Sequence, residues 1–202
     1  MLDVVDALAP ALIAFFAFFF VFLLTTVALI RERTSRTLDR LMASPLRQPE
    51  LVVGYSLGLG VYALAQSLLV TGLSVAVLQL HVYGDLGAVF LVVALLTVGA
   101  GNLGILASSF ARNEFQALQF IPIVIVPQTL LSVAFFPVEV LPGWAQGLGR
   151  AFPLTYAVEA MRKVMVAGAS VGAFEVWWRL LVLAAFALGF VVLGAIGLRR
   201  QR

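Results

Sequence analysis

The sequence contains no cysteine, one histidine and one lysine, and it has few charged residues for its length. Without cysteine no disulfide can form, which excludes a small secreted domain stapled by disulfides. Charged residues make up 11% of the 202 residues and hydrophobic residues 62%, whereas soluble domains have about 25% charged and about 45–50% apolar residues. Too few charges exist to cover a solvated surface. The composition therefore disfavours a soluble enzyme and a disordered chain, and it predicts a membrane protein.

Side chains that carry out chemistry are scarce as well. A phosphate-binding loop of the pattern G-x-x-x-x-G-K-[ST] needs a glycine before its lysine, and the single lysine, Lys163, follows Arg162 instead. The lone His81 cannot assemble a three-ligand zinc site from imidazoles. We therefore expect no catalytic residue, no cofactor-binding residue and no metal site in this chain, and we interpret it as a non-enzyme.

Five intervals without charged residues are long enough to cross a bilayer. In a helix, about 20 apolar residues span the hydrocarbon core of about 30 Å. The predicted spans lie near residues 7–30, 51–80, 86–111, 115–137 and 180–198. They are apolar on all faces and show no alternation of the β-barrel kind. The sequence thus predicts an all-α membrane protein with five transmembrane helices in a single domain, residues 1–202.

The arginines indicate the direction in which the helices cross. Segment 31–50 has five arginines, the turn at 112–114 has one and the tail from 199 has three, and five spans place all nine on one side. Cytoplasmic loops are enriched in basic residues, so we expect a multi-pass protein of the cell membrane with its N-terminus outside and its C-terminus in the cytoplasm. Four basic residues within 139–179 oppose this orientation, but long loops count less in the rule. We read the basic residues as an orientation signal, and we expect no nucleic-acid partner.

Two charged segments between spans have the pattern of short amphipathic helices. Leu38, Leu41 and Met42 recur at helical spacing within residues 34–45, before Pro45 ends the pattern. Such a helix either lies on lipid headgroups or inserts into a groove on a partner protein.

The second segment follows the fourth span. Prolines interrupt residues 137–153, whose apolar pieces are too short to span, and Trp144 suits a membrane interface. Residues 155–166 then predict a helix with Glu159 and Arg162 on its polar face. The segment is either a pair of short helices that dip into the outer leaflet or a peripheral loop with interfacial anchors.

A few polar residues and prolines lie within the predicted spans. Gln66, Asn102 and Gln128 either form hydrogen bonds between helices, worth about 0.6–2 kcal/mol each, or line a path through the membrane. Pro122 and Pro127 remove backbone donors from the fourth span and predict a kink.

The two charged segments resemble the two signatures of one family. Residues 31–46, R-E-R-T-S-R-T-L-D-R-L-M-A-S-P-L, resemble the E-R-E-x-G-T-L-E-R-L-x-x-T/S-P signature of ABC-2 type transporter permeases. Residues 136–162, F-P-V-E-V-L-P-G-W-A-Q-G-L-G-R-A-F-P-L-T-Y-A-V-E-A-M-R, resemble the signature found before that family's last span. They occur in the family's order and on the sides that the arginines indicate, and the resemblance covers essentially the whole chain.

The resemblance implies partners and site residues. It implies a second permease copy, in a homo- or heterodimer, and two cytoplasmic ATPase subunits that bind ATP and Mg²⁺. The cytoplasmic helix would be the coupling helix that contacts the ATPase, and its residues are Arg36, Thr37, Leu38, Arg40, Leu41 and Met42. Re-entrant helices would cap the outer end, with Glu139, Pro142, Trp144, Pro153, Tyr156, Glu159 and Arg162.

The expected function is therefore export. The chain would be the membrane subunit of an ATP-binding-cassette exporter, surrounded by membrane lipid, that moves a drug, lipid or glycan carrier outward with ATP hydrolysed by a separate subunit. The alternative is a non-transporting, truncated membrane partner or an immunity or assembly factor that binds a full-length permease. The family usually has six spans and this chain matches it from the second, so we expect either a shortened permease or an internal start within a longer frame.

Overall fold

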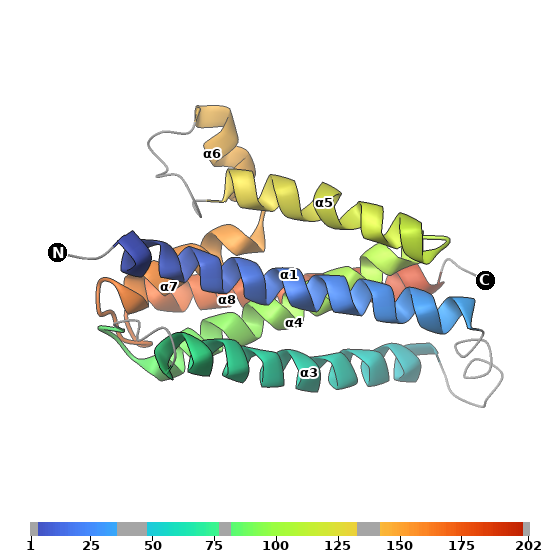
Figure 1. The fold of residues 1–202 in the computed structure, drawn as a ribbon, viewed down its shortest axis with the longest axis horizontal. Helices are drawn as coiled ribbons and strands as arrows, with labels where there is room; N and C mark the ends of the chain where they lie inside the picture. Colours follow the sequence, from blue (N-terminus) through green and yellow to red (C-terminus); the bar gives the residue numbers. More distant parts are fainter. Residues whose placement is uncertain (1–3, 36–47, 77–81, 133–141, 200–202) are drawn as a thin grey trace.

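The computed structural model describes residues 4–35, 48–76, 82–132 and 142–199, and within these ranges it contains helices and no strand. The helices are α1 (Val4–Thr34), α3 (Gln48–Ala76), α4 (Leu86–Phe110), α5 (Glu114–Leu131), α6 (Gly143–Gly149), α7 (Pro153–Met165) and α8 (Phe174–Arg199) (Figure 1). Five of them, α1, α3, α4, α5 and α8, hold stretches long and apolar enough to cross a membrane. The prediction of an all-α protein with five spans is confirmed.

The long helices alternate in direction along the bundle (Figure 1). One end of the bundle, which we call the α7 end, holds α6, α7, the loop before α4 and the first turns of α1 and α8. The opposite end, the α4–α5 end, holds the turn between α4 and α5, the last turn of α1 and the first turn of α3. Val4 and Arg199 therefore lie at opposite ends.

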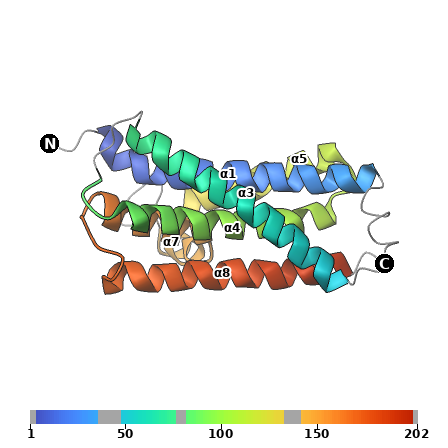
Figure 2. The ribbon, with the colours of Figure 1, turned by 90° about the horizontal axis from the view of Figure 1, so that it is seen from below.

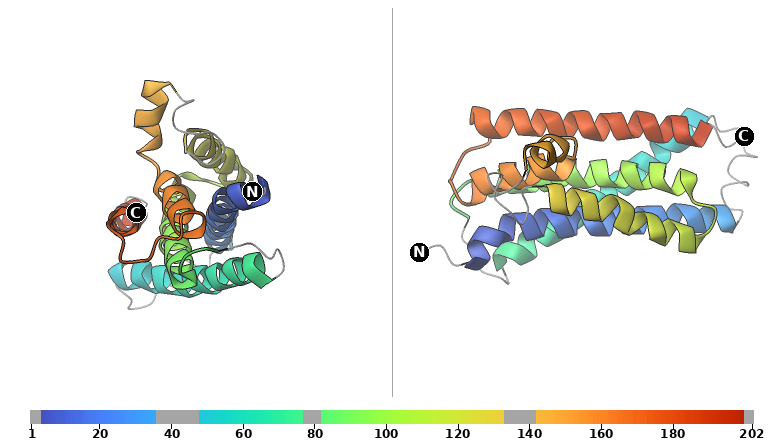
Figure 3. Two further views of the ribbon diagram at one scale, coloured as in Figure 1. Left: turned by 90° about the vertical axis from the view of Figure 1, so that its left-hand side faces the viewer. Right: turned by 90° about the horizontal axis from the view of Figure 1, so that it is seen from above.

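Two helices lie at the margins of the bundle. Helix α3 crosses obliquely over α4, from the start of α1 towards the end of α8 (Figure 2). Viewed along the bundle, α6 projects on one side, near α5, and α3 covers the opposite side (Figure 3). The centre of the bundle consists of α1, α4 and α7, and α8 packs along α4 and α7.

Side-chain caps fix the start of the central helix α4 and the start of its neighbour α5. The carboxylate of Asp85 accepts a hydrogen bond from the amide of Gly87 at 2.9 Å and caps the start of α4. Asn113 caps α5 by accepting from the amide of Gln116 at 2.8 Å, and the side-chain oxygen of Gln116 accepts from the amide of Arg112 at 2.9 Å. This reciprocal pair satisfies amides that a helix start leaves unpaired. It explains how three residues suffice to reverse the chain between α4 and α5.

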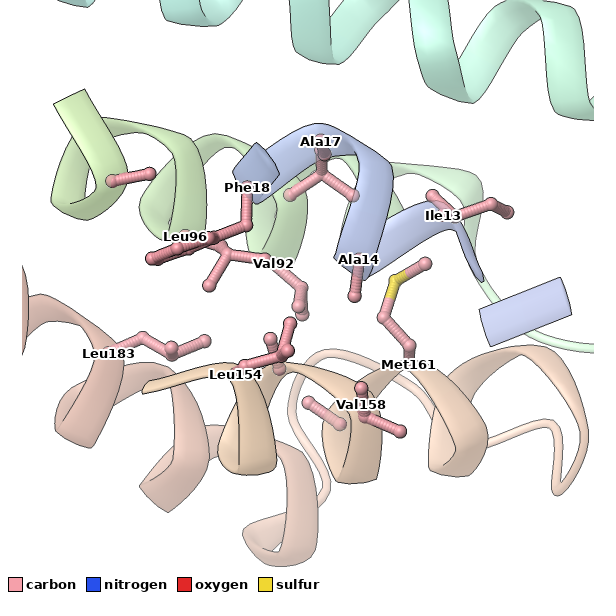
Figure 4. Packing of buried hydrophobic residues seen from close by; sticks show 14 of the residues in the cluster. Ile13, Ala14, Ala17, Phe18, Val92, Leu96, Leu154, Val158, Met161 and Leu183 are labelled. Carbon is pink, nitrogen blue, oxygen red and sulfur yellow. The ribbon is translucent and has the colours of Figure 1, made fainter. Parts of the chain in front are cut away.

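Small side chains let the central helices approach closely. Ala14 and Ala17 of α1 are fully buried, and Figure 4 shows Met161 of α7 pointing towards Ala14. At Gly104 of α4, a Cβ atom would lie 3.0 Å from the carbonyl oxygen of Phe22 in α1. Lipid provides no hydrophobic drive for helices to associate, so close packing at small residues is what holds such helices together.

The last span begins earlier than the charge-free interval 180–198 predicts. Helix α8 starts at Phe174, so Glu175 and Arg179 belong to it. Both charged side chains have partners on α7, which offsets the cost of placing them near the membrane. We predicted the later start because we took the charged Arg179 as the limit of the last span.

The prolines of the fourth span lie within an unbroken helix, and the kink that they predict stays a prediction; two glycines of the second span face open space. Helix α5 is continuous through Pro122 and Pro127, and it ends at Leu131 before the predicted limit of residue 137. A Cβ atom added at Gly54 or Gly58 of α3 would have no neighbouring atom within 4 Å, so this G-x-x-x-G pair packs against no helix in the described part of the chain.

Candidate functional site

The residues predicted to couple to an ATPase, Arg36 to Met42, lie outside the described residues, but the helices on either side of them are described. At the α4–α5 end, the hydroxyl of Tyr55 in α3 donates to the carboxylate of Glu32 in α1. The guanidinium of Arg31 donates to the carboxylate of Glu114 in α5 at 3.2 Å. Both side chains of the Arg31–Glu114 pair are exposed, so the pair contributes little to stability. Residues 36–47 therefore connect two helices that touch each other, one of which also touches α5.

At the α7 end, the helix predicted over residues 155–166 is present as α7, Pro153–Met165. Leu154, Val158, Met161 and Val164 of α7 are at most 1% exposed, because they pack against α1, α4 and α8 and not against lipid (Figure 4). Pro153 stands at the first turn of α7, where its missing amide costs no hydrogen bond. The course of this segment through the outer leaflet stays a prediction.

The polar face of α7 is paired with α8. The carboxylate of Glu159 accepts from Nε of Arg179 at 2.8 Å, and these side chains are only 28% and 14% exposed. Lys163 and Glu175 form a second pair at 2.6 Å, and both side chains are exposed. Burial lowers the pKa of Arg162, and the charge of Glu159 opposes that shift. Predicted cap residues Glu159 and Arg162 thus belong to one charged cluster with Arg179.

Aromatic side chains surround this cluster. The guanidinium of Arg179 lies 4.6 Å from the centroid of the Trp178 ring. Tyr156 meets Trp178 edge to face with centroids 5.8 Å apart, and its hydroxyl donates to the carbonyl of Arg150 at 2.9 Å. Together these groups line a cavity of about 470 Å³, which we call the Arg179 pocket; its lining residues are Arg150, Thr155, Tyr156, Glu159, Trp178 and Arg179.

Two of the remaining predicted cap residues, Pro142 and Trp144, lie at α6. Pro142 precedes the first turn of α6, Trp144 is 68% exposed, and Glu139 lies outside the described residues. The hydroxyl of Thr155 donates to the carbonyl of Gly149 at 2.6 Å and joins α7 to α6. A Cβ atom at Gly149 would lie 2.3 Å from the carbonyl oxygen of Leu131, so α6 also touches the end of α5. Helix α6 is therefore attached to both α5 and α7.

The three polar residues predicted within the spans lie on three different helices. Gln66 of α3 donates to the carbonyl of Ala17 in α1 at 3.2 Å, which supports the helix-packing interpretation for this residue. Asn102 donates to Val98 in its own helix at 2.8 Å. Gln128 of α5 is 2% exposed, and its side-chain oxygen accepts no hydrogen bond within the described part of the chain.

Two features of this arrangement escaped the sequence analysis. The hydroxyl groups of Thr97 in α4 and Ser67 in α3 form a hydrogen bond of 2.9 Å. No pattern in the sequence predicts this contact. The pairing of α7 with α8 did have a signal. Glu159 precedes Lys163 by four residues and Glu175 precedes Arg179 by four, so two helices joined by a short turn carry complementary charges on matching faces.

These observations define a polytopic helical membrane protein with two short helices, α6 and α7, and paired charges at one end. Within the described residues no group of three or more histidine, aspartate or glutamate side chains is placed to hold a metal ion. Residues 2–166 match the family described as ABC-2 type transporter. The chain belongs to the ABC-2 type transporter family.

Curated relatives agree with the family. The chain is 27% identical to "ABC transporter G family member 20" of Dictyostelium discoideum over 98% of this chain and 27% of the relative. It is 28% identical to "Probable multidrug ABC transporter permease YbhR" of Escherichia coli over 87% of this chain and 48% of the relative. It is 29% identical to "Inner membrane transport permease YhhJ" of the same organism over 88% and 47%. The chain thus spans about half or less of the length of these relatives.

Proposed function

We propose that this chain is the membrane subunit of an ATP-driven exporter that moves an amphiphilic or lipid-like substrate outward, with ATP and Mg²⁺ bound by separate cytoplasmic ATPase subunits. Membership of the ABC-2 type transporter family supports this proposal. So does the name of a relative described as a multidrug permease. The α7 end would face outward and the α4–α5 end the cytoplasm, as the distribution of arginines indicates.

The observation that carries the proposal is the narrow attachment of α5. The buried residues of α5 are Ala117, Ile121, Ile125 and Gln128, which form one stripe along the helix. Ile123 and Phe115, on its other faces, are 63% and 71% exposed. A spanning helix held by one stripe has room for a second permease copy on its free faces. The substrate path would run between the two copies.

The contacts at the two ends of α5 suggest how force would be transmitted. At the cytoplasmic end, the ATPase would press on the helix within residues 34–45 and move the adjoining ends of α1 and α3. The Arg31–Glu114 contact would pass that motion to α5. At the other end, the close approach of Leu131 to Gly149 would pass it to α6 and the cap.

The coupling assignment is tested by placing acids on the apolar face of the predicted coupling helix. Leu41→Asp and Met42→Asp are introduced into the chain, which is co-expressed with an ATPase subunit that carries a phosphate-binding loop. We expect loss of co-purification with the ATPase and loss of ATP-dependent uptake of a fluorescent amphiphile by inside-out vesicles. The matched control is Gln48→Asp, which adds an acid at the start of α3 and should leave both unchanged.

Two results would contradict the proposal in different ways. Unchanged association and uptake in the Leu41 and Met42 variants would show that these residues are not the coupling contact. Association with the ATPase but no uptake by the unsubstituted protein would favour the non-transporting partner over the exporter.

A further inference from the structure

Among the described residues, the side chains that line the Arg179 pocket carry more positive than negative charge. Arg150 and Arg179 face it with a single carboxylate, that of Glu159. Arg150 is exposed and forms no ion pair with any residue in the described part of the chain. An arginine without a partner at the wall of a cavity is a ready donor to a phosphate or carboxylate group.

Arg179 is held so that one edge of its guanidinium stays available. Its Nε donates to Glu159 and its Nη1 to the backbone carbonyl of Glu175. Within the described residues no hydrogen bond involves its Nη2, which leaves a donor for a ligand in the cavity. With its side chain only 14% exposed, this donor is fixed in place before any ligand arrives.

A half-buried stripe of α8 runs from this pocket towards the middle of the membrane. Trp178, Val182, Phe186 and Phe190 follow one another at intervals of four residues, and each is partly exposed. The rings of Phe186 and Phe190 have centroids 5.9 Å apart, and Tyr156 contacts Phe186 at 6.0 Å. At about 1.5 Å per residue, Trp178 to Phe190 covers about 18 Å, close to the half-thickness of about 15 Å of a hydrocarbon core.

We propose that the Arg179 pocket binds the phosphodiester headgroup of an anionic phospholipid, whose acyl chain lies along the Trp178–Phe190 stripe of α8. The cavity provides the guanidinium groups of two arginines for the phosphate. The aromatic stripe provides an apolar surface of acyl-chain length directly below. A soluble anion would use the arginines but leave the stripe uncovered, whereas a phospholipid matches both. The site concerns the resting chain in its membrane and does not depend on transport.

The test uses Trp178 as its own reporter. The full chain carrying Trp144→Phe and Trp177→Phe keeps Trp178 as its single tryptophan and is placed in nanodiscs. Quenching is compared for phosphatidylglycerol and phosphatidylcholine that carry the same brominated acyl chain. We expect phosphatidylglycerol to bind about three- to fivefold more tightly, the range of a partly exposed ion pair, and the preference to fall as salt is raised.

Substitutions distinguish lipid binding in this pocket from attraction of the lipid by other positive charges on the surface. Arg150→Gln should abolish the preference, and Arg150→Lys should retain most of it. Lys163→Gln removes a positive charge from the same end of the bundle but outside the pocket, and it should leave the preference unchanged. Equal quenching by the two lipids in the parent protein would overturn the proposal. A preference that survives Arg150→Gln, or that Lys163→Gln lowers equally, would overturn it as well.

Discussion

At the residue scale, the charges of the α7 end differ in how much the fold depends on them. Arg179 and Glu159 are largely buried and face each other, whereas Lys163 and Glu175 are exposed. Removing one partner of a buried pair leaves an uncompensated charge, while an exposed pair contributes little. The two neighbouring pairs therefore have different roles, although both connect the same two helices.

This difference is testable with single substitutions. Arg179→Gln should lower the free energy of unfolding by about 2–3 kcal/mol, because Glu159 then remains buried without its cation. Lys163→Gln should leave the unfolding temperature nearly unchanged, because Glu175 stays solvated. Thermal unfolding of the purified proteins in one detergent measures both. Equal effects of the two substitutions would show that burial does not determine how much the Arg179–Glu159 pair contributes to stability.

At the scale of elements, α6 is joined to α5 by close backbone approach. Gly149 of α6 lies so near the carbonyl of Leu131 that no side chain fits between them, whereas Gly147 of the same helix has nothing within 4 Å. Gly149 is thus required by packing, and Gly147 is not.

The pair provides a matched experiment. Gly149→Ala should push α6 away from α5 and destabilise the protein by about 1–3 kcal/mol, the usual cost of overpacking. Gly147→Ala should be neutral or slightly stabilising, because alanine favours a helix over glycine. Thermal unfolding reports the change, and a loss of transport in Gly149→Ala alone would link the cap to α5 movement. A stable, active Gly149→Ala protein would contradict the close approach.

Elements also show where sequence reasoning works. Long intervals without charge located all five spans, because nothing else in the chain has to exclude charge over that length. The ends were less accurate. Helix α8 begins before Arg179 because α7 supplies partners for its charged residues, and pairing between distant segments is not visible in local composition. The Ser67–Thr97 contact and the Arg179 pocket depend on the same kind of long-range placement.

At the scale of the whole molecule, the absence of cysteine becomes an experimental advantage. A single introduced cysteine is the only thiol, so it reports its position without interference. Cysteine at Gly143, beside the exposed start of α6, should react with a membrane-impermeant maleimide in intact cells. Cysteine at Arg112 should react only after permeabilisation. The reverse pattern would show that the α7 end faces the cytoplasm.

Single cysteines can also test whether two copies of the chain associate. Ile123→Cys on the exposed side of α5 should form a disulfide-linked dimer when membranes are oxidised, because a second copy would cover that face. Ile125→Cys, which replaces a side chain that is 7% exposed in the monomer, should remain uncrosslinked. Non-reducing gels measure both variants. If neither Ile123→Cys nor cysteines at neighbouring exposed positions of α5 form a crosslink, a dimer through this helix is contradicted.

The capped turn between α4 and α5 has a consequence for how the protein enters the membrane. Glu114–Leu131 is the least apolar of the five spans and contains two prolines, whereas Leu86–Phe110 is strongly apolar. Three residues separate them, and the Asn113–Gln116 cap closes the turn. We expect α5 to be inserted during synthesis as the second arm of a helical hairpin whose first arm is α4. Helix α5, which passes motion to α6 in the proposed mechanism, would thus depend on α4 for its insertion into the bilayer.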